Sequence, residues 1–446
     1  MSLLAVTAAL GFTLYQPGSN APAFVWKEFL HGLIFHDLFW VSFILSSFIL
    51  AWDLTIGVLG LWAAKRTKPR EGGAWAPGHR FAFLIPAHNE EKVIGYLLDS
   101  LSSLDYPDTL FDVYVAADRC TDGTAEVARE KGAFVIEREG GQGGKTWNVR
   151  HALRVIPLEA YDALVIIDAD NLVDPGFLKA MDRFLTLHPE AQAVQGYVDV
   201  KNPRDGWIPR AMALSYWLTN SLWQDAREKL GLSPTLGGTG MVFRTSYLLR
   251  RGWQARSLTE DLELYAELVA QGDRVYWCHE ARVYDEKPNR IRSSYRQRVR
   301  WYQGHFFVFW TYGLSVLKRV WRGHGLERLR ALDTFFYLAA PWNRLLLGLL
   351  ALGLIDRFSV WSVVYSLFFM VLSAAGATKA RFGKVRVEWI FWSWAALLYA
   401  FMWFPVALEA LFKWRDQSTW VKTEHTAQMG MEAVLPSRKD TFLVER

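Results

Sequence analysis

Two carboxylates that follow an apolar run are the first residues in this sequence with an evident chemical use. Asp168 and Asp170 form "DAD" directly after "LVII". On an extended segment, side chains two residues apart point to the same side, so both carboxylates could face one divalent ion and the phosphates that it bridges. The structural alternative is that Asn171 and Asp174 cap a helix that begins near Pro175. The pattern by itself leaves both interpretations open.

A second acidic group opens a helical pattern. In "SLTEDLELYAELVAQG" (Ser257–Gly272), Thr259, Glu260 and Asp261 fall in the expected first turn, where the helix dipole favours negative charge. Plain N-capping would explain such residues. A carboxylate kept ionised there could also accept the proton of an attacking hydroxyl, which makes Asp261 a candidate general base.

The stretch "SYRQRVRWYQGH" combines dense positive charge with aromatic residues and runs into the apolar "FFVFWTYGLSVL". Gln297, Arg300, Trp301, Gly304 and His305 share one face of a helix, because they recur at intervals of three and four residues. A guanidinium suits a diphosphate, and an indole suits the apolar face of a sugar. The alternative is an interfacial helix whose arginines reach to the membrane surface.

Two glycine-rich segments could approach a ligand with their backbone. The loop "GGQGGKTWN" lacks the spacing of a nucleotide-binding P-loop, but its Lys145 could still reach a phosphate. The alternative for Lys145 is an ordinary solvated loop lysine. The segment "LGGTGMVFR", which contains Gly238, enters an expected strand through a tight turn.

The elements that must position these residues lie between residues 75 and about 300. Short apolar runs alternate there with helical patterns, which predicts an α/β domain with a largely parallel sheet. Three expected strands end in polar segments: "PAHNEE" with Pro86 and Glu90, "DRCTDGT" with Asp118, and "DAD". Ligands of open α/β sheets bind at the carboxyl ends of the strands, so we expect these segments to meet at one site.

Apolar segments of spanning length flank this domain. Residues 38–64 contain a single charge, Asp53, and basic residues follow directly. Further apolar segments cover residues 335–355, 360–377 and 389–412. About 20 apolar residues span a bilayer, and basic flanks are typical of the cytoplasmic side. Arg344 interrupts the second segment, and polar residues at such depth usually face other helices or a cavity. The alternative for residues 38–64 is a buried helix of a large soluble core.

The expected organisation is therefore five parts. They are an N-terminal membrane segment (1–74), a cytoplasmic catalytic domain (75–300), interfacial amphipathic helices (301–330), about three transmembrane helices (331–413) and a tail (414–446). The extreme N-terminus, "MSLLAVTAALGFTLY", is expected to be interfacial or a weak extra span. The net charge of +5 fits a membrane-surface enzyme and not a nucleic-acid binder, and two cysteines imply no disulfide framework and no metal–thiolate site.

In order along the chain, "PAHNEE", "ADRCTDGT", "GGKTWN", "DAD", "GGTGMVFR", "TED" and "QRVRW" resemble the motif series of membrane-integrated family-2 glycosyltransferases. That group includes the cellulose, chitin, hyaluronan and poly-N-acetylglucosamine synthases. The resemblance covers roughly Phe81 to His305. It implies a GT-A (Rossmann-like) α/β fold flanked by transmembrane helices, and inverting transfer from a nucleotide diphosphate sugar, expected to be a UDP-sugar.

The resemblance also implies a role for each matched residue. The implied donor-binding residues are Pro86, Glu90, Asp118, Lys145, Asp168 and Arg300. Asp170 would bind Mg²⁺ or Mn²⁺, and Asp261 would be the general base. The implied acceptor-binding residues are Gly238, Glu260, Gln297 and Trp301.

The leading functional expectation is a processive synthase of the inner or plasma membrane that elongates and exports a polysaccharide. The alternatives are transfer of a single sugar to a lipid acceptor and a catalytically silent subunit that only binds nucleotide sugars. Before the domain, one strong span stands where polymer synthases often have more. An export channel would therefore require a homo-oligomer or a partner.

Overall fold

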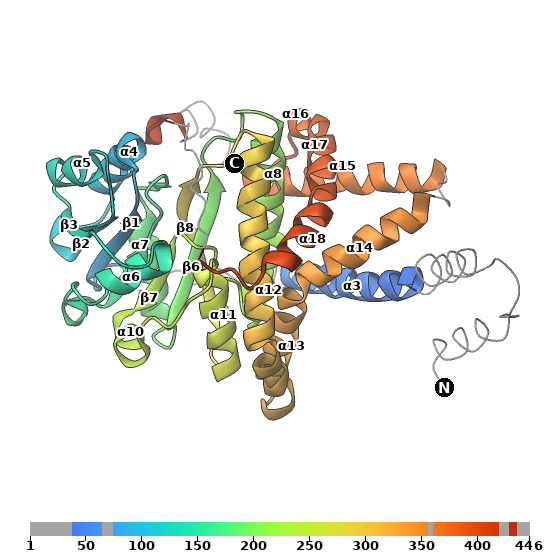
Figure 1. Ribbon diagram of the computed structural model, residues 1–446, viewed down its shortest axis with the longest axis horizontal. Helices are drawn as coiled ribbons and strands as arrows, with labels where there is room; N and C mark the ends of the chain where they lie inside the picture. The colour runs from blue at the N-terminus through green and yellow to red at the C-terminus, as the bar shows by residue number, and fades with distance from the viewer. Residues whose placement is uncertain (1–37, 65–74, 356–359, 419–427, 435–446) are drawn as a thin grey trace, which may run out of the picture.

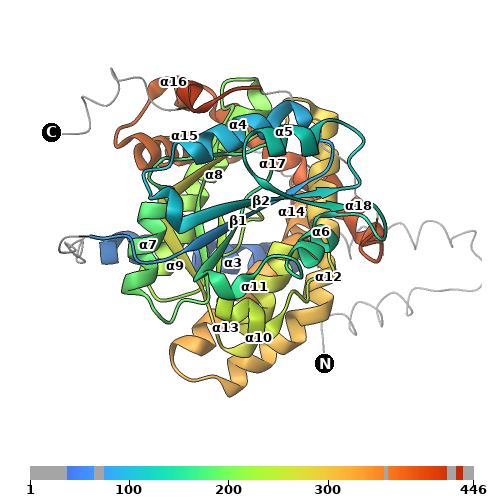
Figure 2. The ribbon, with the colours of Figure 1, turned by 90° about the vertical axis from the view of Figure 1, so that its left-hand side faces the viewer.

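The computed structural model describes residues 38–64, 75–355, 360–418 and 428–434. Within them, a mixed eight-stranded sheet forms the centre of the α/β part, in the order β3-β2-β1-β4-β7-β6-β8-β5 (Figures 1 and 2). The strands are β1 (Phe81–Ala87), β2 (Phe111–Asp118), β3 (Phe134–Arg138), β4 (Ala163–Ile166), β5 (Leu172–Val173), β6 (Ala193–Val200), β7 (Met241–Arg244) and β8 (Val275–Asp285).

The sheet is less parallel than expected. Strands β1 to β4 pair in parallel, as the alternating pattern predicts, but β7 is antiparallel to both β4 and β6. β6 and β8 are parallel to each other. The difference arises in the second half of the domain, where β7 enters the sheet from the glycine-rich turn. A parallel strand would require a crossover that returns the chain to the end of the sheet where β4 begins, and β7 instead starts from the opposite end.

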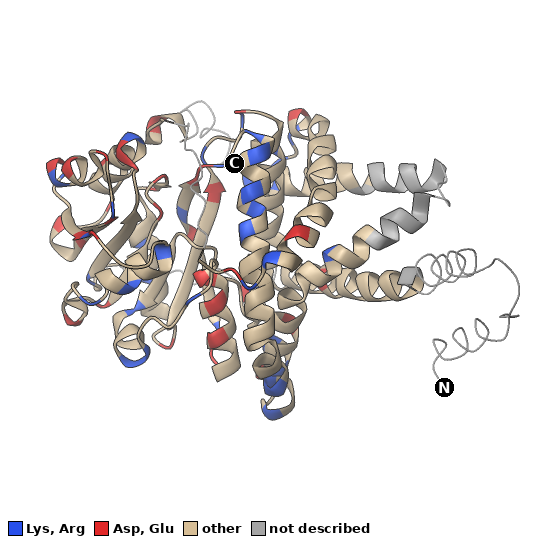
Figure 3. Cartoon of the chain, in the orientation of Figure 1, with Lys and Arg blue, Asp and Glu red and all other residues tan. Residues whose placement is uncertain are grey.

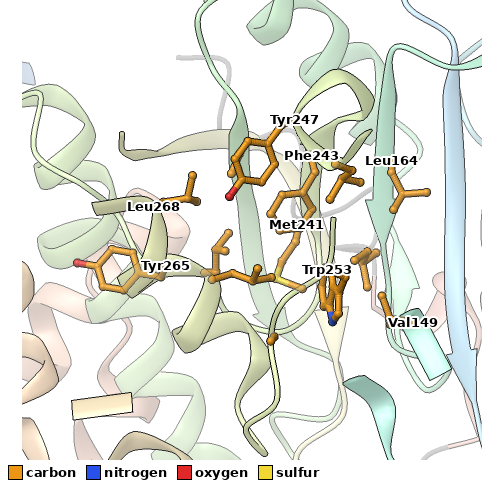
Figure 4. Close-up of a cluster of buried hydrophobic side chains, with 14 of the residues drawn as sticks. Val149, Leu164, Met241, Phe243, Tyr247, Trp253, Tyr265 and Leu268 are labelled. Atoms are coloured by element: carbon orange, nitrogen blue, oxygen red, sulfur yellow. The ribbon is translucent and has the colours of Figure 1, made fainter. Parts of the chain in front are cut away.

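Both faces of the sheet are covered by helices, which explains why its strands are continuous apolar runs. In β1, Phe81, Phe83 and Ile85 face helices α4 (Glu91–Ser102), α5 (Thr124–Glu130) and α7 (Phe177–Leu187). Ala82 and Leu84 face the opposite layer, with α6 (Lys145–Ala152), α10 (Thr245–Arg251) and α11 (Glu260–Gln271). Figure 4 shows the centre of this second core, where Met241 and Phe243 of β7 lie among Trp253, Tyr247 and Leu268.

The remaining helices stand against the far edge of the sheet. They are α8 (Trp207–Leu218), α9 (Ala226–Lys229), α12 (Ile291–Arg322), α13 (Leu326–Leu338), α14 (Ala340–Ile355), α15 (Val360–Phe382), α16 (Val387–Phe391), α17 (Ser393–Phe401) and α18 (Trp403–Lys413). A π-helical turn, Thr219–Asp225, joins α8 to α9. In Figure 1, α12 stands between the sheet on one side and α14, α15 and α3 (Leu38–Ala64) on the other.

Helix α12 is continuous for 32 residues. The expected boundary at residue 300, between the catalytic domain and the interfacial helices, therefore falls inside one helix. The charged half of α12 lies beside the sheet, and its apolar half packs on α13. In Figure 3, Lys and Arg lie on the upper part of α12, and Asp and Glu lie on the neighbouring α11.

Within the part of the chain that the structure describes, two helical stretches are long and apolar enough to cross a membrane, and they suggest membrane association. They are Trp40–Ala63 within α3, and Val387–Lys413, which contains α16 to α18. The described parts of α3, α14 and α15 carry few charges in Figure 3. Helix α3 has the bounds expected from the sequence. The N-terminal segment "MSLLAVTAALGFTLY" and the basic residues 65–70 lie outside the described residues.

A buried group of charges, here called the junction cluster, joins α3 to the α/β domain. It consists of Asp53 of α3, Arg227 of α9 and Asp333 of α13. Arg227 is 0% exposed, donates to both carboxylate oxygens of Asp333 at 2.7 and 2.8 Å, and donates to Asp53 at 3.1 Å. Trp52 donates to Asp333 at 2.9 Å, and Trp223 stacks on the guanidinium. A membrane-type helix is thus held by ion pairs as well as by apolar packing.

Candidate active site

A cavity of about 530 Å³ lies at the carboxyl ends of β1, β2 and β4 and extends toward α12, α14 and α18. The structure brings every site residue expected from the sequence to its lining. These are Pro86, Glu90, Asp118, Lys145, Asp168, Asp170, Gly238, Glu260, Asp261, Gln297, Arg300 and Trp301. Their placement agrees with the rule that ligands bind beyond the strand ends. Their individual roles remain predictions.

Lys145 lies at the centre of the site, because it contacts three of the sequence motifs at once. Its Nζ lies 2.6 Å from Asp168 and 3.1 Å from Glu260, and it donates to the carbonyl of Gly238 at 2.5 Å. Burial lowers the pKa of Lys145, but the two carboxylates outweigh burial and hold that pKa above its ordinary value. The ammonium group is therefore charged and neutralises part of an acidic site.

The strand-end carboxylate Asp118 is held by arginines. It is 3% exposed and accepts hydrogen bonds from Arg138 at 2.9 Å and from Arg119 at 3.3 Å. The backbone N–H of Glu90 donates to Thr124 at 2.8 Å, which fixes the loop after β1. Arg138 is thus a functional candidate that the sequence analysis missed. It stands at the end of β3, where the same strand-end rule would have found it.

Asp170 is buried beside another carboxylate, Asp285, at the end of β8. Asn171 separates the two. With its amide oriented to match its neighbours, it donates to Asp170 at 3.1 Å and to Asp285 at 3.2 Å, and it accepts from Thr239 at 2.6 Å. Burial raises the pKa of Asp285 to about 6; Lys287 acts in the opposite direction, and the charge of Asp170 raises the pKa further. Asp285 also follows the strand-end rule and was missed.

These carboxylates fit a divalent cation that is shared with a ligand. The described residues contain no group of three or more His, Cys, Asp or Glu side chains arranged to hold a metal ion by themselves. Mg²⁺ and similar ions often bind through one or two carboxylates and complete their shell with substrate phosphates and water. Asp168 and Asp170 line the same cavity. Burial raises the pKa of Asp168, the charge of Lys145 opposes this, and the charge of Asp170 raises the pKa further. Both observations indicate negative charge that a cation would relieve.

Asp261 has the surroundings of a base. It stands in the first turn of α11, where its Oδ1 accepts from the N–H of Leu262 at 2.8 Å. Burial, and then the neighbouring charge of Glu260, raise its pKa from 3.8 to about 7. Gly238 has φ +81°, and a Cβ at that position would lie 3.4 Å from Oδ2 of Asp261. Glycine therefore keeps the backbone turn unstrained and leaves this oxygen accessible.

Helix α12 contributes a cation and an indole to the opposite wall. Burial lowers the pKa of Arg300, and the charges of Glu260, Asp168 and Asp261 act in the opposite direction. Among the residues that the structure describes, neither Nε of Arg300 nor Oε1 of Gln297 has a hydrogen-bond partner, and both atoms are buried. Trp301 is half-buried on the same wall. These groups have unused donors and acceptors that face the cavity.

The other arginines of this stretch do not line the cavity. Arg298 is 0% exposed and lies under the rings of Tyr399 and Trp403, 4.1 and 5.1 Å from their centroids. Arg296 is exposed. Arg298 lies two residues from Arg300 and therefore on a different face of the helix. Arg296 shares the face of Arg300 but lies one turn away, and of the three arginines only Arg300 lines the cavity.

Gly304 serves close packing between two helices. A Cβ at this position would lie 2.2 Å from Oγ1 of Thr259, so the backbone of α12 lies directly against the side chain of the residue before α11. Glu263 orders the same loop by accepting the N–H groups of Arg256 and Ser257 at 2.8 and 2.7 Å. Gln417, from the chain after α18, accepts the N–H of Leu258 at 2.8 Å. The segment that carries Asp261 is thus fixed from three sides.

Comparison with known proteins gives a family match over this part of the chain. The family model described as "Glycosyltransferase like family 2" matches residues 77–304. The chain is similar to beta-monoglucosyldiacylglycerol synthase of Synechocystis, with 24% identity over 419 residues that cover 85% of this chain and 83% of the relative. It is also similar to hyaluronan synthase 3 of Xenopus laevis, with 23% identity over 289 residues that cover 62% of this chain and 49% of the relative.

Among solved structures, the fold is similar to that of the mannosyltransferase PcManGT from Pyrobaculum calidifontis, in complex with GDP-Man and Mn²⁺. The TM-score is 0.56 at 21% sequence identity, and the match covers 86% of this chain and all of the other. The expected α/β fold of the GT-A type is therefore confirmed, with a mixed sheet in place of the largely parallel one.

Proposed function

This chain belongs to glycosyltransferase family 2, and we propose that its cavity transfers a sugar from a nucleotide diphosphate sugar to a hydroxyl group presented at a membrane surface. The observation that carries this proposal is the position of Asp261. A half-buried carboxylate whose pKa is raised to about 7 shares one cavity with the Nε of Arg300 and with the Asp168–Asp170 pair. A base, a cation and a paired carboxylate site are the groups that this transfer requires.

In the proposed reaction, the acceptor oxygen attacks the anomeric carbon from the face opposite the diphosphate. The new C–O bond forms as the bond from that carbon to the diphosphate oxygen breaks, which inverts the configuration. Asp261 takes the hydroxyl proton, and Arg300 stabilises the negative charge that develops on the leaving diphosphate. A bound Mg²⁺ or Mn²⁺, held by Asp170 with Asp168 beside it, would supply further positive charge to the diphosphate.

The donor half of the cavity is proposed to lie at the strand ends. Pro86, Glu90 and Asp118 would contact the nucleotide. Lys145 would exchange part of its contact with Asp168 and Glu260 for a donor phosphate, because a charged lysine between two carboxylates is already placed for anion binding. A UDP-sugar remains the expected donor. PcManGT, the similar structure, holds GDP-Man.

The acceptor is proposed to be a membrane lipid, and a growing polysaccharide is the second candidate. The far end of the cavity is formed by α14 and α18, of which α18 lies in a stretch apolar enough to cross a membrane. This favours an acceptor that reaches the site from the bilayer. Trp301 instead favours a sugar acceptor, because an indole can pack on a sugar ring. The two relatives reflect both classes, since one is named for a glucosyldiacylglycerol product and the other for hyaluronan.

The same arrangement supports a proposal for location. We infer a multi-pass protein of the inner or plasma membrane, with α3 and the helices from α14 onward in the bilayer and the α/β domain on the cytoplasmic side. The junction cluster supports this because it fixes α3 to the domain. Labelling of a cysteine introduced at exposed Arg154 should then succeed in inside-out vesicles and fail in intact cells.

The deciding experiment for the reaction uses the purified full chain with a panel of radiolabelled nucleotide diphosphate sugars and Mg²⁺ or Mn²⁺. The lipid and water-soluble fractions are then separated and sized. A single sugar in the lipid fraction supports a lipid acceptor, and a ladder of long products supports polymer synthesis. If none of the donors binds or turns over, while binding of other ligands is intact, the proposed function is wrong.

A further inference from the structure

We propose that the far end of the cavity, around Arg344, binds the phosphate of a membrane phospholipid whose headgroup carries the acceptor hydroxyl. The inference rests on the proposed function and names its acceptor more closely. It comes from a residue that the reaction described above does not use. Arg344 is a permanent cation in α14, where the sequence is otherwise almost entirely apolar.

The polar neighbour of Arg344 is used in packing between helices, whereas the side chain of Arg344 is exposed at the cavity. Asn343 accepts a hydrogen bond from Ser46 of α3 at 2.7 Å, which explains an amide at that point. Arg344 forms no ion pair with any residue that the structure describes. It donates a hydrogen bond to the Tyr302 hydroxyl at the cavity wall, and its charge acts on Asp53 of α3. A charge placed in an apolar helix is costly, so one that is kept without an ion pair usually serves a ligand.

Two other arginines among the same helices show what a structural role looks like. Arg227 is buried and paired with both carboxylates of the junction cluster. Arg298 is buried under the rings of Tyr399 and Trp403. Each has its charge satisfied within the protein. Arg344 has an exposed side chain that opens into the cavity, so its donors remain available to an anion.

The surroundings of Arg344 specify a lipid. Trp301, Tyr302 and Trp403 line the same cavity as Arg344 and supply it with aromatic surface. On the outer side of the neighbouring helices, Phe401 and Phe412 are 61% and 80% exposed, as expected of a surface in contact with acyl chains. A ligand with a phosphate at Arg344 could place its chains along this apolar surface and its headgroup in the cavity.

The chemistry of the site specifies both a phosphate and a hydroxyl. A guanidinium fork matches phosphate oxygens in geometry and charge. Asp261 can act as a base only if the acceptor brings a proton, so the attacking group is a hydroxyl and not the phosphate itself. The acceptor oxygen would bond to the anomeric carbon, its proton would pass to Asp261, and the nucleotide diphosphate would leave. The phospholipid phosphate would remain unchanged at Arg344.

The test measures binding of three small probes to the detergent-purified full chain by isothermal titration calorimetry. Dihexanoylphosphatidylglycerol carries phosphate, hydroxyls and chains. Dihexanoylglycerol lacks the phosphate, and glycerol 1-phosphate lacks the chains. The variant is Arg344→Gln, and the matched control is Arg322→Gln, which removes an exposed arginine at the end of α12. Arg344→Lys keeps the charge, and thermal unfolding reports whether each variant is folded.

We expect Arg344→Gln to weaken binding of dihexanoylphosphatidylglycerol about ten- to a hundredfold, the effect of losing a charged hydrogen bond. Arg322→Gln should bind like the parent chain, and Arg344→Lys should recover part of the affinity. Binding of dihexanoylglycerol should not change. Equal phosphatidylglycerol binding by Arg344→Gln and the parent chain would overturn the proposal, as would an equal loss of dihexanoylglycerol binding. Glycerol 1-phosphate binding as tightly as the lipid would show a soluble phosphate site instead.

Binding of a nucleoside diphosphate serves as the separate readout for the proposed function. Arg344→Gln should bind it like the parent chain, because Arg344 lies at the other end of the cavity. If the parent chain fails to bind it, the donor assignment fails and the lipid result is still decided by its own probes. If the parent chain binds it and the lipid probes do not respond to Arg344, only the headgroup inference fails.

Discussion

Two groups of charges in this protein, one buried at the junction of α3 with the domain and one half-buried at the cavity, differ in how completely they are matched. In the junction cluster, Arg227 donates three hydrogen bonds to Asp333 and Asp53, and the ring of Trp223 stacks on its guanidinium. At the cavity, Lys145 contacts two carboxylates, but Arg300 forms no ion pair with any described residue and Asp261 accepts only a local backbone hydrogen bond among the interactions described for it.

The difference indicates how the two groups contribute to the protein. Charges that satisfy one another hold elements together, and their removal leaves a buried partner without compensation. Charges that face a cavity with unused donors and acceptors keep their interactions for a ligand. The comparison therefore predicts opposite consequences for substitutions in the two places. Cavity substitutions should affect turnover and leave folding intact, whereas junction substitutions should affect folding first.

The largest effect on turnover is expected from losing the metal. An excess of chelator, or Asp170→Asn, should remove detectable sugar transfer, because the diphosphate would leave without the cation that neutralises it. The thermal unfolding temperature should change little, since this carboxylate fills no apolar core. Transfer and unfolding are measured on the same preparation. Full activity in chelator would show that Asp170 holds no essential ion.

The second largest loss of sugar transfer is expected from Asp261→Asn. The amide keeps the shape of the side chain and cannot accept a proton, so transfer should fall by about 10²- to 10⁴-fold while nucleotide binding persists. In the parent chain, transfer should rise with pH through about 7, as Asp261 loses its proton. Loss of nucleotide affinity in the variant would make Asp261 a donor ligand instead.

Asp261 also makes folding depend on pH. Because its pKa is raised from 3.8 to about 7 in the folded chain, the folded state binds more protons than the unfolded state between those values. The contribution of Asp261 to stability is therefore favourable at low pH and declines as the pH rises through that window. Asp261→Asn should lack this decline, which unfolding curves at pH 5 and pH 8 would reveal by comparison with the parent chain.

A direct contrast comes from replacing one arginine in each group. Arg227→Met should lower the free energy of unfolding by about 3–5 kcal/mol, because Asp333 and Asp53 lose their cation inside the protein. Arg300→Met should change it by less than about 1 kcal/mol, since no ion pair is broken, and should mainly slow transfer. Chemical denaturation of both variants measures this, and similar losses would remove the distinction between the two groups.

The smallest predicted effect concerns Trp301. If its indole forms the acceptor platform, Trp301→Ala should reduce acceptor use by about ten- to a hundredfold, the equivalent of 1–3 kcal/mol, and spare hydrolysis of the donor by water. Trp301→Phe, which keeps a ring, should lose less. If transfer and hydrolysis decline in parallel, the indole serves packing or membrane anchoring.

Local pattern predicted much of this structure. Helix α3 and the first strands were predicted because a long apolar run and buried strands leave strong periodic signals. The strand-end rule predicted that Asp118, Asp168 and Asp170 would meet. The same rule, applied to β3 and β8, also identifies Arg138 and Asp285. The sequence "VYD" at the end of β8 does not indicate, however, that Asp285 lies close to Asp170.

Other features depend on tertiary contacts that no local pattern records. The antiparallel pairing of β7 with β4 and β6 depends on the end of the sheet from which the chain enters β7. Gly304 looks like part of a binding face, yet its role is the close approach of α12 to Thr259. Arg298 and Arg300 occur in the same basic stretch of the sequence. Only the packing of α17 and α18 on α12 shows that Arg298 is covered by aromatic rings while Arg300 lines the cavity.

The junction cluster also sets an order of events during synthesis. Arg227 is made 174 residues after its partner Asp53, and Asp333 is made 281 residues after Trp52, which donates to it. At about 5–20 residues per second, these intervals are about 9–35 s and about 14–56 s. Helix α3 therefore leaves the ribosome long before its ion-pair partners exist. A nascent chain that stops before α13 contains α3 but lacks Asp333, so the junction cluster cannot form in it. Docking of α3 through this cluster therefore occurs late in assembly.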